Sequence, residues 1–246
     1  MKKLLIILSA ILLLAFVSCD DSGNAPTNPL ENIPTATKGE MTEEVFATLD
    51  SIMKLGNSFQ DGSVDFDKVQ QTSNYSKSDG TLVYTLKNTY AQDNYSQTLE
   101  IHSPLENHPD WKTISIEGTP GDATYKINGV ESNDKESEIS EFFKTFPTLI
   151  SDLNASATGI MDNVTLDGKK YDVTVESSSS GYSSYEKETF TPTYANGIST
   201  IETWISFDAT EAKIKGIVRI TGGENEGTYS LTEEQINSLT TQAPSN

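Results

Sequence analysis

The residues best suited to metal or acid–base chemistry lie in one short stretch of the chain. The sequence holds only two histidines, His102 and His108, and both are close to Glu106 and Asp110. Imidazole and carboxylate groups bind zinc and act as general acids and bases. However, their spacing matches no defined ligand motif, and two prolines predict an irregular loop that does not align the side chains. We therefore expect solvated loop residues here rather than a metal site.

Other catalytic patterns are missing from the sequence. It contains no G-x-S-x-G elbow, no H-E-x-x-H and no Walker-type phosphate loop. The acidic residues 61–67 place their glycine wrongly for an EF-hand loop. Calcium binding by other acidic loops stays an open alternative because the chain is rich in acidic residues. We predict a protein without enzymatic activity and without a cofactor, and we keep an envelope hydrolase as the least favoured alternative.

Cys19 is the only cysteine, and the residues before it have the order of a secretory signal. Two lysines precede a largely apolar run over residues 4–17, which is too short to span a bilayer because that takes about 20 apolar residues. Residues 16–19, Phe-Val-Ser-Cys, resemble the lipobox of bacterial lipoproteins, although that family usually has leucine where Phe16 stands. The resemblance implies cleavage before Cys19 and acylation of its sulfur, which accounts for an unpaired cysteine.

This interpretation divides the chain into three parts. Residues 1–18 form the signal peptide, residues 19–41 the acylated cysteine and a disordered tether, and residues 42–246 a single α+β domain. The tether holds three prolines among Asn, Thr, Ser and Gly, a composition that cannot bury a core. We find no repeat of fixed period and no second linker within the domain.

The sequence also limits the partners and the location. There are 36 acidic residues against 17 basic ones, a net charge of −19 at pH 7 that repels phosphate backbones and argues against nucleic acid. We expect a bacterial cell-envelope protein held on a membrane by its acyl anchor. The outer membrane is favoured, the periplasmic and surface faces both stay open, and no protein partner is indicated.

Three helices are expected in the domain. The first begins at a Thr42 N-cap and ends near Gly56. The second follows residues 133–134 and carries a broad apolar stripe, with a kink or break expected at residues 143–146 because Pro147 lies inside it. In the third, Thr232 and Gln235 form a capping box.

Most of the remaining chain alternates with period two, which indicates strands with one buried and one wet face. Residues 82–87, 170–175 and 213–220 alternate most clearly, and a hairpin turn at residues 167–168 and another at residues 222–227 separate candidate strands. Residues 177–185 are rich in serine and tyrosine and predict a polar surface loop, with a binding loop as the alternative. The predicted fold is α+β, with a curved, mostly antiparallel sheet packed on one face by an N-terminal and a long central helix.

The order helix, strands, helix, strands behind a lipobox resembles the LolA and LppX group of envelope lipid carriers. Residues 149–175 are similar to the strand-turn-strand of that group, and residues 198–220 are similar to its late hairpin. The resemblance implies a half-barrel sheet that wraps around helices and holds a lipid.

Under that resemblance, the ligand is a lipid or another hydrophobic molecule between sheet and helices, bound by burial of apolar surface. The expected lining is the apolar face of the second helix: Phe142, Phe143, Phe146 and Leu149. In the alternative, these side chains fill a closed core, and the protein is a surface-exposed interaction or structural lipoprotein.

Overall fold

The computed structural model describes residues 29–53, 65–91, 94–119, 122–181, 183–208 and 210–240. The predicted signal peptide, Cys19 and the tether up to residue 28 lie outside these residues. Within the described part of the chain, no helix combines the length and the apolar character needed to cross a membrane.

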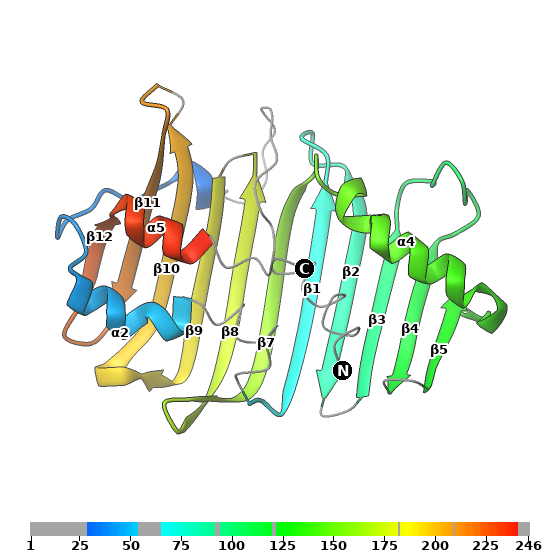
Figure 1. Ribbon diagram of the computed structural model, residues 1–246, viewed down its shortest axis with the longest axis horizontal. Helices are drawn as coiled ribbons and strands as arrows, with labels where there is room; N and C mark the ends of the chain where they lie inside the picture. Colours follow the sequence, from blue (N-terminus) through cyan, green and yellow to red (C-terminus); the bar gives the residue numbers. More distant parts are fainter. Residues whose placement is uncertain are drawn as a thin grey trace.

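The described strands form one open antiparallel sheet, so the predicted α+β class with an antiparallel sheet is confirmed (Figure 1). Its order is β12-β11-β10-β9-β8-β7-β1-β2-β3-β4-β5-β6. The bounds are β1 Lys68–Ser76, β2 Leu82–Ala91, β3 Asn94–Ile101, β4 Thr113–Thr119, β5 Asp122–Ile127, β6 Val130–Glu131, β7 Asn154–Leu166, β8 Lys169–Ser180, β9 Ser183–Tyr194, β10 Ile198–Asp208, β11 Lys213–Thr221 and β12 Gly227–Leu231.

Two meanders make up this sheet. Strands β1 to β6 follow one another along the chain and in space, and so do β7 to β12. The antiparallel pairing of β1 with β7, which sets Tyr75 opposite Ala155, joins the two halves. The first strand of each meander therefore lies in the middle of the sheet.

Three α-helices lie in front of the sheet in Figure 1: α2 Glu43–Met53, α4 Glu136–Leu149 and α5 Glu233–Thr240. Phe46, Leu49 and Ile52 of α2 and Ile236 of α5 share a hydrophobic cluster with side chains of β7 to β12. Helix α4 shares a second cluster with side chains of β1 to β4. We call the face that carries these side chains the helix-side face and the opposite one the far face. The short helices are η1 Pro29–Glu31, η2 Asn133–Lys135 and η3 Ala195–Gly197.

Local signals placed two helix starts and one turn correctly. Thr42 Oγ1 accepts a hydrogen bond from the backbone N–H of Val45 at 3.4 Å, at the start of α2. In the α5 capping box, Gln235 N–H donates to Thr232 Oγ1 at 3.2 Å, and Thr232 N–H donates to Gln235 Oε1 at 3.0 Å. At the β7–β8 turn, Asp167 has positive φ, as a two-residue hairpin requires.

The prediction of a break in the second helix near Phe143 is wrong. Helix α4 runs through Pro147 and ends at Leu149. The ring of Pro147 removes a backbone N–H only in the last turn, so it limits how far the helix continues rather than interrupting it.

The predicted loop at residues 177–185 is also wrong. Strand β8 continues to Ser180, and β9 begins at Ser183. Ser177 pairs with Glu186 and also with Ala157 of β7, so the serine backbone is hydrogen-bonded on both sides. Because serine side chains lie on both faces of this strand, its sequence shows no alternation of apolar and polar residues. The backbone nevertheless forms hydrogen bonds with the neighbouring strands.

The predicted tether needs a correction over residues 29–41. Thr37 and Lys38 both donate their backbone N–H groups to Thr228 O, and Met41 N–H donates to Ser230 O at 2.8 Å. Met41 itself is buried. This stretch runs beside β12, so the folded domain begins near Pro29 rather than at residue 42.

Candidate functional site

The predicted ligand-lining residues divide into two groups. Phe142, Phe143 and Phe146 are buried within the α4 cluster, whereas the side chain of Leu149 is 45 % exposed. The Phe146 ring contacts those of Tyr75 and Tyr84, with centroids 5.7 and 5.3 Å apart. The Phe146 ring thus packs against side chains of β1 and β2, and the role of the three phenylalanines in lining a ligand stays a prediction.

The two histidines have separate structural partners. His102 Nε2 lies 3.1 Å from Thr85 Oγ1. The His108 ring stacks on Trp111 with centroids 3.8 Å apart, and its Nδ1 lies 3.4 Å from Glu138 Oε1. Across the described ranges, no group of three or more His, Cys, Asp or Glu side chains is placed to hold a metal ion.

A row of side chains crosses the middle of the helix-side face at right angles to the strands. Each member pairs with the next in the antiparallel register, so all of them share one face. We call it the central row; from β9 to β3 its members are Glu188, Val175, Gly159, Gln71, Asn88 and Gln97. The row runs between the two hydrophobic clusters, and it carries polar groups at both ends.

Glu188 marks the first end of the row. Its side chain is 2 % exposed, and it interacts with Glu186, two residues earlier on the same face of β9. Burial raises the pKa of Glu188 well above the ordinary value of 4.5, and the adjacent Glu186 carboxyl raises it further. Glu188 Oε2 has no hydrogen-bond partner among the described residues.

Among the described residues, no positively charged side chain forms an ion pair with Glu186 or Glu188. The positions paired with Glu188 are Val175 and Ile201, and those paired with Glu186 are Ser177 and Thr203. Lys187 lies between the two glutamates in sequence, but strand alternation turns it to the far face. There its Nζ lies 3.6 Å from Glu176.

Sequence reasoning missed this pair. The signal was a period-two series, Glu186, Glu188 and Phe190, that ends on a buried aromatic residue. Because the residues between them are Lys187 and Thr189, the segment reads as uniformly polar. Only the pairing with β8 and β10 shows that the glutamates share the face of the core.

Asn88 and Gln97 mark the other end of the row. Gln97 Nε2 donates to Asn88 Oδ1 at 3.1 Å, and both side chains are buried. Asn88 Nδ2 and Gln97 Oε1 have no partner within the part of the chain that the structure describes. With about 4.8 Å between neighbouring strands, Glu188 and Asn88 are about 19 Å apart across the sheet.

The stretch between these ends has small side chains on the helix-side face. Strand β7, in the middle, contributes Ala155, Ala157 and Gly159 there. A Cβ added to Gly159 would meet no atom closer than 3.9 Å, and its φ is not positive. Within the described residues, neither backbone conformation nor close packing therefore requires glycine here.

The far face holds a different cluster, around Trp204. Arg219 lies over the indole ring at 5.1 Å, and it also donates to Glu202, which accepts from the Tyr185 hydroxyl at 3.1 Å. Burial and the Glu202 charge raise the pKa of Tyr185. Trp204 Nε1 donates to Pro29 O at 3.0 Å, so this cluster receives the N-terminal segment.

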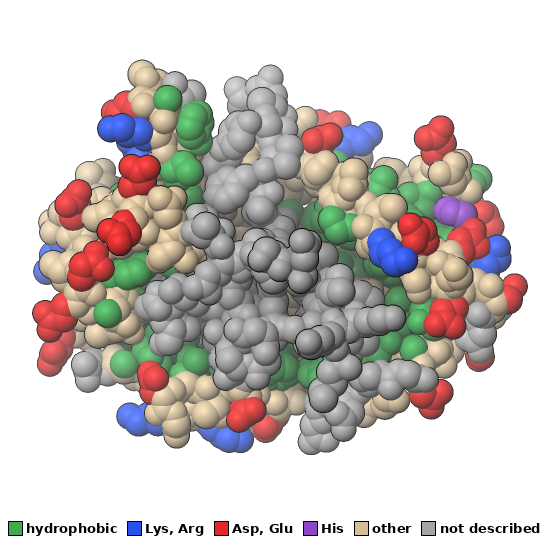
Figure 2. Space-filling model, viewed as in Figure 1, with side chains coloured by type: hydrophobic (Ala, Val, Ile, Leu, Met, Phe, Trp, Pro, Cys, Tyr) green, Lys and Arg blue, Asp and Glu red, His purple; other side chains and the backbone are tan. Residues whose placement is uncertain are grey.

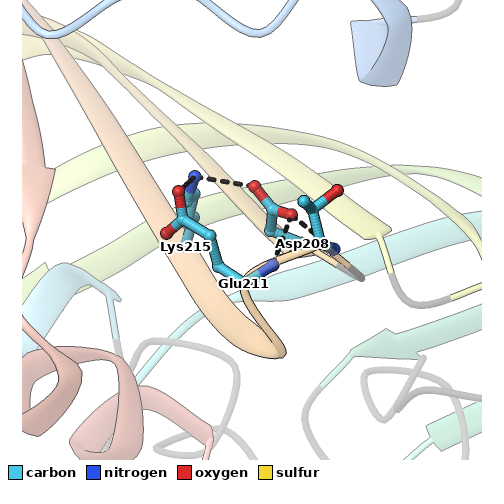
Figure 3. Close-up of polar contacts among 4 residues, drawn as sticks. Asp208, Glu211 and Lys215 are labelled. Atoms are coloured by element: carbon cyan, nitrogen blue, oxygen red, sulfur yellow. Dashed lines mark hydrogen bonds and ion pairs between the residues drawn. The ribbon is translucent and has the colours of Figure 1, made fainter.

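The β10–β11 connection carries an ion pair that is supported by backbone hydrogen bonds. Asp208 accepts from Lys215 Nζ at 2.7 Å and from the backbone N–H groups of Thr210 and Glu211 (Figure 3). Together these donors lower the pKa of Asp208 to about 2. The lysine neutralises the carboxylate, so this arrangement braces a turn.

Surface charge gives no further candidate. Figure 2 shows acidic side chains scattered over the visible face among fewer basic ones, and not gathered in one patch. The central row, with its partnerless polar atoms, is therefore our candidate site. No family model, curated protein or solved structure matches this chain.

Proposed function

We propose that this protein is a lipoprotein of the bacterial cell envelope that binds a lipid or another hydrophobic ligand without catalysing a reaction. The acyl chains on Cys19 attach it to a membrane, with the outer membrane favoured. The ligand lies on the helix-side face along the central row, between the sheet and the helices. In this proposal the sheet is curved as a half-barrel, as in the LolA and LppX group.

The observation that carries the proposal is the pattern of the central row. Buried polar atoms without partners are rare in folded proteins, and each costs about 1–3 kcal/mol. Here Glu188 Oε2, Asn88 Nδ2 and Gln97 Oε1 occur on one face and in one row. A bound molecule with polar ends and an apolar middle would supply the missing hydrogen bonds and cover the small side chains of β7.

One observation favours the alternative, a surface-exposed interaction or structural lipoprotein with a closed core. The rings of Phe142 and Phe146 contact Trp111, Tyr75 and Tyr84, as in an ordinary aromatic core. For this reason we place the ligand over the central row rather than beneath α4.

A hydrolase is the least supported candidate. Glu186 and Glu188 lie two residues apart on one face of β9 and interact with each other. Glycosidase carboxyls lie about 5 Å or more apart on the two sides of the scissile bond. Neighbouring side chains of one strand do not flank a bond in this way.

The test is photo-crosslinking in intact cells that express the full-length protein. Cells are fed a fatty-chain probe carrying a diazirine, and the labelled peptides are mapped by mass spectrometry. We expect labels on β7, β8 and β1, in the middle of the helix-side face. Labels confined to the exposed far face, or no label above that of an unrelated lipoprotein, would contradict ligand binding at this site.

A further inference from the structure

The Glu186–Glu188 pair lacks the partner that a buried carboxyl pair normally has. Buried carboxylates are usually paired with a cation or neutralised. Glu188 is 2 % exposed, and valine, serine, isoleucine and threonine occupy the four positions paired with the two glutamates. No ion pair to either carboxyl occurs within the described ranges. The lysine between them faces the other side of the sheet.

A purely structural role does not account for this arrangement. Glu188 Oε2 is buried and has no hydrogen-bond partner among the described residues. A glutamine or an apolar residue at this position would serve packing better, since neither loses a charge on burial. This oxygen is thus left to accept from a donor that is not part of the described chain.

The two ends of the central row differ in chemistry. Asn88 and Gln97 are neutral and offer one donor and one acceptor, whereas the Glu186–Glu188 end offers only carboxyl oxygens. Between them lie Val175 and Gly159, which carry no polar side chain, and then Gln71, whose amide donates to Ser73. A ligand along this row therefore meets acid at one end, an apolar stretch over β8 and β7, and amides from Gln71 to Asn88, which is about 19 Å from Glu188.

We propose that the Glu186–Glu188 pair binds the ammonium group of an amphipathic amine whose hydrocarbon tail lies across β8 and β7. This inference rests on the proposed function and adds the charge of the ligand. A protonated amine brings the donors and the positive charge that the pair lacks. An anionic head group, such as a carboxylate or a phosphate, finds no opposite charge at this pair. The tail buries apolar surface at about 25 cal/mol per Å².

Isothermal titration of the full-length protein in a nonionic amphipol tests this proposal, with the amphipol alone as the blank. The probes are octylamine, octanol and octanoate, which share one tail length and differ in head group. The variants are Glu188→Gln, Glu186→Gln and a matched control, Glu176→Gln, which removes a carboxylate from the far face. Circular dichroism confirms that each variant is folded.

We expect octylamine to bind more tightly than octanol, and octanoate to bind most weakly. Since a hydrogen bond to a charged group contributes about 1.5–3 kcal/mol, Glu188→Gln should weaken octylamine binding about tenfold to hundredfold. Octanol binding should change little, and Glu176→Gln should leave all three affinities as they are.

Two results would overturn the inference and leave the proposed function standing. One is equal binding of all three probes with no effect of Glu188→Gln, and the other is tighter binding of octanoate than of octylamine. Failure of all three probes to bind would overturn the proposed function and this inference together.

Discussion

At the residue scale, the buried carboxyl of Glu188 should make the free energy of unfolding depend on pH. Its folded pKa is raised, so the folded protein keeps a proton that the unfolded chain loses from about pH 4.5 upward. The stability linked to this group is complete below that pH and is lost as the pH rises through the folded pKa. Glu188→Gln removes this loss. The free energy of unfolding of the variant should therefore rise relative to that of the wild type as the pH rises, by at most about 1.4 kcal/mol per pH unit.

Urea unfolding of both proteins at several values between pH 5 and pH 8 measures this difference. Comparing the two proteins cancels the contributions of the other carboxyls. Asp208, whose pKa is lowered to about 2, is ionised in both states over this range and adds no slope. Parallel curves for the two proteins would show that Glu188 ionises in the folded protein as easily as in the unfolded chain.

Also at the residue scale, alanine variants of Phe146 and Leu149 distinguish a filled core beneath α4 from an open ligand site. Phe146 is 2 % exposed and contacts two tyrosine rings, so Phe146→Ala should lower the free energy of unfolding by about 3–5 kcal/mol. Leu149→Ala removes a largely exposed side chain from the same helix and should change it by less than about 1 kcal/mol. Chemical denaturation gives both numbers, and a loss at Phe146 no larger than at Leu149 would mean that the Phe146 ring is not packed in a core.

At the scale of elements, the capping box of α5 allows a clean test. Thr232→Ala removes the hydroxyl that accepts from Gln235 N–H, and it should destabilise the protein by about 1 kcal/mol. Ser238→Ala, inside the same helix, serves as the control and should not lower stability. Thermal unfolding compares the two variants. A Thr232→Ala protein as stable as the control would contradict the role of this cap.

The docking of the N-terminal segment is a second property of an element. Trp204→Phe removes the indole N–H that donates to Pro29 O, so amide exchange at residues 30–38 should become faster. Tyr185→Phe alters the same far-face cluster but leaves that hydrogen bond intact, and exchange should stay slow. Hydrogen–deuterium exchange with mass spectrometry reads both variants, and equal exchange in the two would show that the bond does not hold the segment.

These elements also show what sequence reasoning can reach. The capping box, the Asp167 turn and the alternating strands were predicted because each depends on neighbours a few residues apart. Strand β1 was not predicted, since its sequence KVQQTSNYS has no regular alternation of apolar residues. Its backbone is satisfied by β2 and β7, which no local pattern indicates. Glu188 was missed for the same reason.

At the scale of the whole molecule, one sheet carries two separate hydrophobic clusters. Each draws mainly on one meander and its helices, and the pairing of β1 with β7 places small and polar side chains between them. The expected α+β class followed from the order of helices and strands. The central row could not be predicted from that order, because it forms only when six strands from both halves of the sheet lie in register.

Native mass spectrometry of the full-length protein, released from cell membranes into a nonionic amphipol, tests ligand binding most directly. We predict a species heavier than the unliganded protein by one bound molecule, which gentle activation removes. We further predict that this adduct is reduced in a variant that fills the row at Gly159→Phe and retained in a far-face control, Thr158→Phe. A spectrum with only the unliganded protein, or an adduct that is equally abundant in both variants, would contradict a ligand on the central row.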